Sequence, residues 1–119
     1  MTFTDIQERV AKTAAFTGAG IDVAAITEDW TIKLQVEALT AAKGARFQFE
    51  DTVNDWTASL VGPVFNLKGA VAAEYDKVKS WKKQDFPSLR IGTGSGQLRL
   101  KLAALDGSAS VTYHAWLEY

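Results

Sequence analysis

Hydrophobic residues recur at every second position in four stretches of this chain. The clearest alternation runs over residues 30–39, and the same pattern returns in residues 45–51, 97–105 and 108–119. Successive side chains of a β-strand point to opposite faces, so each stretch can bury one face and present the other to solvent or to a partner. Four such stretches in 119 residues predict an antiparallel all-β protein.

Three weaker strands are predicted over residues 62–69, 75–83 and 87–92, with turn residues between them. The Asp106-Gly107 pair separates two alternating stretches, which predicts a β-hairpin at this point. About eight short strands at this spacing are typical of a sandwich, jelly roll or barrel. We predict an antiparallel β-sandwich of jelly-roll type.

The first twenty residues carry two conflicting patterns. Residues 4–7 fit a helix capping box, and Ile6, Val10 and Ala14 have helical spacing, which predicts a short helix. The segment also reads as a first strand or an extended arm, and we favour that interpretation. The predicted domain organisation is an N-terminal arm or first strand over residues 1–20 and one β-sandwich domain over residues 21–119.

The inward positions of the predicted strands define an expected core. They alternate with charged or hydroxyl side chains, as a half-buried strand requires. The expected core consists of Trp30, Ile32, Leu34, Val36, Phe47, Phe49, Phe65, Leu67, Leu89, Ile91, Leu98, Leu100, Leu102, Val111, Tyr113 and Leu117.

Composition narrows the range of functions. The chain is 47% hydrophobic and 23% charged, as in soluble globular proteins, and its net charge of −1 gives no field that would attract nucleic acid or a membrane. It has no cysteine, which excludes disulfides, thiolate metal sites and a cysteine nucleophile. Residues 1–10 do not resemble a signal peptide, and no apolar run is long enough to cross a bilayer. We expect a protein that is made in the cytoplasm.

No pattern in the sequence defines a catalytic site. His114 is the sole histidine, and nothing identifies a nucleophile and an orienting group for it. The acidic run 50–55 lacks the ligand spacing of a calcium loop, and the glycines of 92–96 do not fit a phosphate loop. The lysines of 77–83 lie around Trp81, but the overall charge disfavours nucleic-acid binding. We expect no enzyme activity, no cofactor and no metal.

Aromatic residues are the strongest candidates for binding. The chain has four tryptophans, and aromatic side chains outside the core can anchor a protein interface or stack on sugar rings. Strand parity places His114 and Trp116 on the face opposite Val111 and Leu117. The candidate interface residues are His114, Trp116, Tyr119, Trp56 and Trp81.

The segments GIDVAAITEDWTIKLQVEAL, FQFEDTVNDW, SWKKQDFPSLRIG and LRLKLAALDGSASVTYHAWLEY together resemble small β-sandwich proteins of tailed-bacteriophage virions. Head decoration (cement) and minor capsid proteins are the type meant, and the similarity is one of pattern over residues 20–119. The resemblance implies non-covalent binding to the major capsid protein or another virion subunit, location in the virion, and a homo-oligomer, with a trimer favoured. The stretch GIDVAAITEDWTIKLQV also resembles jelly-roll carbohydrate-binding modules, which makes glycan binding the alternative.

Overall fold

The computed structural model describes residues 1–54, 56, 62–68, 78–92 and 96–119. These residues form an all-β protein without an α-helix in the described part, and one 3-10 turn at Lys83–Asp85 follows the seventh strand. The strands are β1 (Phe3–Lys12), β2 (Phe16–Thr17), β3 (Ile21–Asp22), β4 (Thr31–Leu39), β5 (Ala45–Asp51), β6 (Val64–Leu67), β7 (Lys79–Lys82), β8 (Gln97–Leu105) and β9 (Val111–Glu118).

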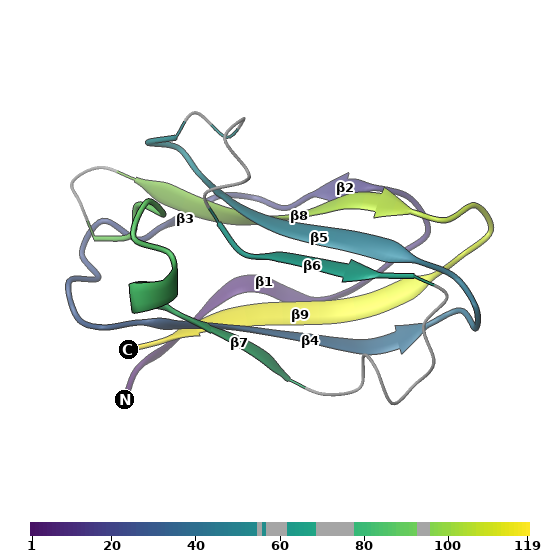
Figure 1. Ribbon diagram of the computed structural model, residues 1–119, viewed down its shortest axis with the longest axis horizontal. Helices are drawn as coiled ribbons and strands as arrows, with labels where there is room; N and C mark the ends of the chain where they lie inside the picture. Colours follow the sequence, from purple (N-terminus) through teal and green to yellow (C-terminus); the bar gives the residue numbers. More distant parts are fainter. Residues whose placement is uncertain (55, 57–61, 69–77, 93–95) are drawn as a thin grey trace.

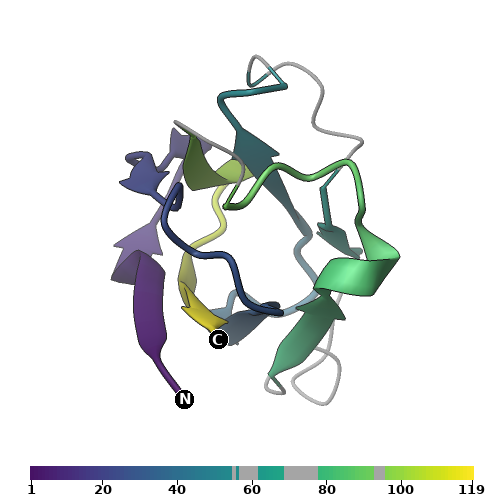
Figure 2. The ribbon, with the colours of Figure 1, turned by 90° about the vertical axis from the view of Figure 1, so that its left-hand side faces the viewer.

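The strands form two antiparallel sheets that lie face to face (Figures 1 and 2). One sheet has four strands in the order β1-β9-β4-β7. The other has five strands, in which β2-β8-β5-β6 run side by side and β3 also pairs with β8. The pairs are nested along the chain, because β1 pairs with β9, β2 and β3 with β8, β4 with β7, and β5 with β6.

The N-terminal segment belongs to both sheets. Residues 3–12 form the edge strand β1, and the chain then crosses to the other sheet, where Phe16 and Ile21 lie opposite Leu102 and Leu98. The short helix is therefore a wrong prediction, and the first strand is confirmed. The helical spacing misled because β1 is irregular: its register with β9 shifts twice, which moves apolar residues away from strict alternation.

The Asp106-Gly107 hairpin is also a wrong prediction. This turn joins β8 to β9, but β8 pairs with β5 while β9 pairs with β4 and β1, so the connection crosses from one sheet to the other. The side chain of Asp106 accepts a hydrogen bond of 2.7 Å from the backbone N–H of Gly44, and Ala109 N–H donates to the Asp106 carbonyl. These bonds fix an arch between sheets, for which a two-residue hairpin turn is too short.

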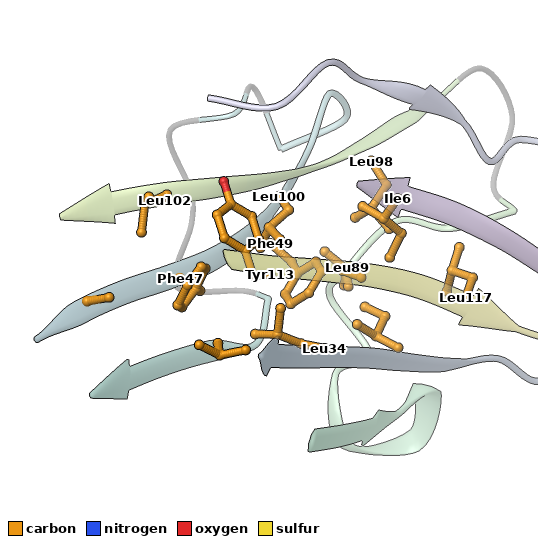
Figure 3. Packing of buried hydrophobic residues seen from close by; sticks show 14 of the residues in the cluster. Ile6, Leu34, Phe47, Phe49, Leu89, Leu98, Leu100, Leu102, Tyr113 and Leu117 are labelled. Carbon is orange, nitrogen blue, oxygen red and sulfur yellow. The ribbon is translucent and has the colours of Figure 1, made fainter. Parts of the chain in front are cut away.

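The core between the sheets matches the prediction closely. Fifteen of the sixteen expected core residues are buried, and Phe65 is half-buried against them. Figure 3 shows side chains from both sheets meeting in this layer, with the Tyr113 ring edge-on to Phe47 at 4.8 Å between centroids. The sequence analysis missed Ile6, Val23, Ile26 and Leu39, which are buried as well.

Tyr113 is the one polar side chain at the centre of this layer. It is fully buried, and its hydroxyl points toward β8 without a hydrogen-bond partner among the described residues (Figure 3). Burial disfavours the phenolate and raises the pKa of Tyr113 to about 12.

The strand predicted over residues 87–92 is not formed. Leu89 and Ile91 are buried as expected, but they lie in turns and bends, where the backbone N–H of Leu89 bonds to the Phe86 carbonyl. Gly92 ends this segment with a φ of +77°, and a Cβ there would lie 1.8 Å from the Ile26 carbonyl oxygen. The segment is a loop that covers one end of the core.

Candidate interface on the outer face of the four-stranded sheet

Register brings outward side chains from all four strands of β1-β9-β4-β7 into straight rows. Directly paired residues of an antiparallel sheet lie on the same face, so the strand register defines which side chains are neighbours. We call this outer surface the open face. Its first row consists of Phe3, Glu118, Thr31 and Lys82, its second of Asp5, Trp116, Lys33 and Ser80, and beyond these lie His114, Gln35, Glu37 and Arg9.

Trp116 lies at the centre of the two rows and is held in place by its neighbours. Its indole N–H donates a 2.9 Å hydrogen bond to a carboxylate oxygen of Glu118. Phe3, which is 62% exposed, and Asp5 lie beside these residues, and together with His114 they line a shallow depression of about 340 Å³. The depression therefore combines the exposed ring of Phe3 and the half-buried ring of Trp116 with two carboxylates.

His114 is tied into a polar chain that crosses the face. Its Nε2 lies 3.1 Å from Oε1 of Gln35 and 3.9 Å from Oε1 of Glu37. Glu37 in turn pairs with Arg9, which reaches across from the edge strand β1. The His114 ring lies 4.9 Å from that of Trp116, so this chain supports one side of the aromatic patch. It has no nucleophile in it, and the arrangement suits binding.

Tyr119 connects the two ends of the chain at the edge of the open face. Its hydroxyl lies 2.9 Å from Oγ1 of Thr4, and its backbone exchanges two hydrogen bonds with Thr2. Half-buried against the core, Tyr119 holds the start of β1 against β9. The terminal aromatics thus pack on their own fold as well as facing outward, and both chain ends lie side by side (Figure 1).

Trp56 lies on the opposite side of the molecule, over the outer face of the five-stranded sheet. Its ring stacks on the Arg99 guanidinium at 4.0 Å, and Arg99 pairs at 2.8 Å with Glu50, which is only 3% exposed. Gln48 donates a further hydrogen bond of 2.9 Å to Glu50. We call this surface the closed face, because the Glu50 carboxylate is buried in it and bonded to Arg99 and Gln48.

Trp81 belongs to neither outer face. It lies opposite Ile32 and points between the sheets, with its ring 5.7 Å from Phe49 and 6.4 Å from Phe65. Sequence reasoning placed it on an exposed edge strand because the lysines on both sides suggested solvent. The structure therefore brings His114 and Trp116 together on the open face, places Tyr119 against the core at the end of the chain, and separates Trp56 and Trp81 from this patch.

The acidic run 50–55 is a turn that is bonded internally in its described part. Both oxygens of the buried Asp51 accept hydrogen bonds of 2.7 Å from Asn54, and one accepts a third bond from the backbone N–H of Arg90. Within the described ranges, no three His, Cys, Asp or Glu side chains gather where a metal ion could bind. Asp55 lies outside the described residues, as do Lys77 and residues 93–95 of the glycine run.

Sequence reasoning did not name Phe3, Asp5, Lys33 or Lys82, among other residues of the open face, as interface candidates. The parity of Lys33 with the outward side of residues 30–39 was a usable signal. Phe3 and Asp5 gave none, because the structure of residues 1–20 was ambiguous and their position beside Trp116 depends on pairing over more than 110 residues.

Comparisons with known proteins add no relative to this description. No family model matches the chain, and neither the curated proteins nor the solved structures include a significant match. In the part of the chain that the structure describes, no helix has the length and apolar character needed to span a membrane.

Proposed function

We propose that this chain is a non-catalytic structural protein of a bacteriophage virion and that it assembles through its open face. The observation that carries the proposal is the aromatic patch of Phe3, His114 and Trp116 among charged side chains of both signs. Aromatic anchors within a polar rim are the composition of protein interfaces. The polar chain around His114 fixes the patch without supplying a catalytic group.

The fold type of the proposal is a β-sandwich of jelly-roll type. Its support is the nested pairing, in which the first strand lies beside the last and each inner pair follows in turn. If β2 and β3 are counted as two parts of one strand, the described residues form eight strands in two sheets of four, as in a jelly roll.

On this proposal the chain is made in the host cytoplasm and resides in the virion. Its partners are the major capsid protein or another virion subunit, together with further copies of itself. The contact is non-covalent, and a stable one buries about 1,200–2,000 Å² of surface in total.

The test is quantitative mass spectrometry of particles purified from the virus that encodes the chain. We expect the chain in the particles at a fixed ratio to the major capsid protein. Particles that carry Trp116→Ala should hold several-fold less of it. Val53→Ala is the matched control, because Val53 is a half-exposed apolar residue away from the open face. Absence of the chain from particles, or full occupancy by Trp116→Ala, would overturn the proposal.

Glycan binding is the second candidate, and the depression beside Trp116 favours it. An aromatic ring can stack on the C–H face of a sugar while Asp5 and Glu118 accept hydrogen bonds from its hydroxyls. A glycan array followed by titration calorimetry tests this function. Saturable binding that Trp116→Ala abolishes and Val53→Ala preserves would support it, and an array without a reproducible ligand would reject it.

A further inference from the structure

The open face is divided into an acidic and a basic half. In its first row the acidic residue is Glu118 on β9 and the basic one is Lys82 on β7. In its second row Asp5 on β1 faces Lys33 on β4 across the intervening Trp116. Both rows therefore run from negative on β1-β9 to positive on β4-β7. Arg9 on β1 and Glu37 on β4 have the opposite sign to the halves in which they lie, but they pair with each other and so offset one another.

From this division we infer that the partner of the open face is a second copy of the same chain. The inference rests on the proposed function only in taking the open face as an assembly surface. Consider a two-fold axis that lies in the interface, runs parallel to the strands and passes between β9 and β4. Rotation about this axis places the acidic half of each copy over the basic half of the other. The contact is isologous, so each favourable pair occurs twice. An axis across the strands would place like charges over one another.

The same rotation gives Trp116 a specific neighbour. A residue of β9 in one copy comes to lie over the corresponding residue of β4 in the other, so Trp116 of each copy faces Lys33 of the second. An ammonium group over an indole ring is the favoured cation–π geometry. Phe3 is brought toward Lys82 of the second copy in the same way. In this arrangement the aromatic rings of one copy therefore lie over the lysines of the other.

The size of the face predicts a weak dimer. Four strands at about 4.8 Å spacing and about eight residues at ~3.3 Å each give a surface of roughly 20 by 26 Å. This is at the low end of specific interfaces, where association is transient. We therefore expect a dimer that forms at tens to hundreds of micromolar, in place of the trimer that the resemblance implies.

The test is charge exchange followed by mixing, with mass measured by sedimentation equilibrium. The double variant Lys33→Glu/Lys82→Glu makes both halves of the open face acidic, and Asp5→Lys/Glu118→Lys makes both halves basic. Each variant alone should keep the monomer mass of 13.0 kDa at the protein concentration at which half of the wild-type chains are dimeric. An equimolar mixture of the two should recover the doubled mass, because opposite faces then meet.

The control is Lys43→Glu/Lys68→Glu, which changes the net charge equally at two lysines away from the open face. It should dimerise like the wild type. Raising the salt from about 50 to 500 mM should weaken the wild-type dimer several-fold, since exposed charges are screened over a few ångströms at that concentration. A wild-type chain that is monomeric at 1 mM, or a mixture that stays monomeric, would overturn the inference.

These results are separable from the test on particles. A chain found at fixed ratio in virions but monomeric in solution keeps the proposed function and rejects the two-fold contact. If mixing the two charge variants restores the dimer but the chain is absent from particles, the two-fold contact is kept and the proposed function is rejected.

Discussion

The two outer faces of this protein use the same kinds of side chain in opposite ways. On the closed face Glu50 is 3% exposed, and Arg99 and Gln48 bond to it while Trp56 covers the guanidinium. On the open face Phe3 is 62% exposed, and the acids of β1-β9 and the lysines of β4-β7 form separate halves. On the closed face the buried carboxylate is paired with a cation, whereas on the open face the acids and the lysines lie in separate halves.

The difference teaches which polar strand positions serve the fold and which are available for a partner. A buried carboxylate must find a cation or hydrogen-bond donors inside the molecule, because leaving it unpaired costs several kcal/mol. A half-exposed charge is solvated and adds little to stability, so its placement is free to serve association. Parity alone does not separate the two cases, since Glu50 and Glu118 both occupy outward positions.

Leu100→Ala sets the scale for the comparison, because Leu100 lies on the inner side of β8 next to Arg99 on its outer side. The substitution leaves a cavity in a fully buried site and should lower the free energy of unfolding by about 2–5 kcal/mol. Urea denaturation followed by tryptophan fluorescence measures this change. An unchanged midpoint would contradict the strand parity on which both faces are defined.

Arg99→Met tests whether the closed face is structural. The substitution keeps the aliphatic stem but leaves the buried Glu50 carboxylate without its cation, so we expect a loss of about 3 kcal/mol. The matched variant is Lys33→Met on the open face, which should change the free energy of unfolding by less than about 0.5 kcal/mol. Equal losses in the two variants would erase the distinction between the faces.

Tyr113 tests the layer between the two sheets by its response to alkaline pH. Its pKa is raised to about 12, above the value of about 10 in the unfolded chain, so the folded state keeps a proton that the unfolded state loses. Below pH 10 the protonated Tyr113 does not lower the free energy of unfolding. As the pH rises from 10 to 12, the free energy of unfolding falls by roughly 3 kcal/mol in total. Tyr113→Phe should remove this fall, as seen from urea midpoints between pH 9 and 11.5. The same variant should be as stable as the wild type or up to about 1 kcal/mol more stable at pH 7, since the hydroxyl has no partner among the described residues. If the free energy of unfolding of Tyr113→Phe still fell between pH 9 and 11.5, the alkaline loss of stability would belong to other groups.

The sequence predicted those parts of the fold that depend on local alternation. The long strands, nearly all core residues and the outward direction of His114 and Trp116 followed from a period of two, because burial on one face imposes that period. The arch at Asp106 was misjudged as a hairpin because a turn signal does not say which sheet the next strand joins. The charge division of the open face could not be foreseen, since it requires the register of β1 against β9 and of β7 against β4.

Trp116→Ala should change the stability of the fold only slightly, which gives a sharp contrast with Arg99→Met. Trp116 is half-buried on the open face, and its neighbours Glu118 and His114 remain solvated when it is removed. We expect the free energy of unfolding to fall by less than about 1 kcal/mol in dilute solution, where the chain is monomeric. At high protein concentration the same variant should fail to associate, which sedimentation equilibrium detects. A loss in dilute solution as large as that of Leu100→Ala would place Trp116 in the core of the fold, and the open face would then lose its central anchor.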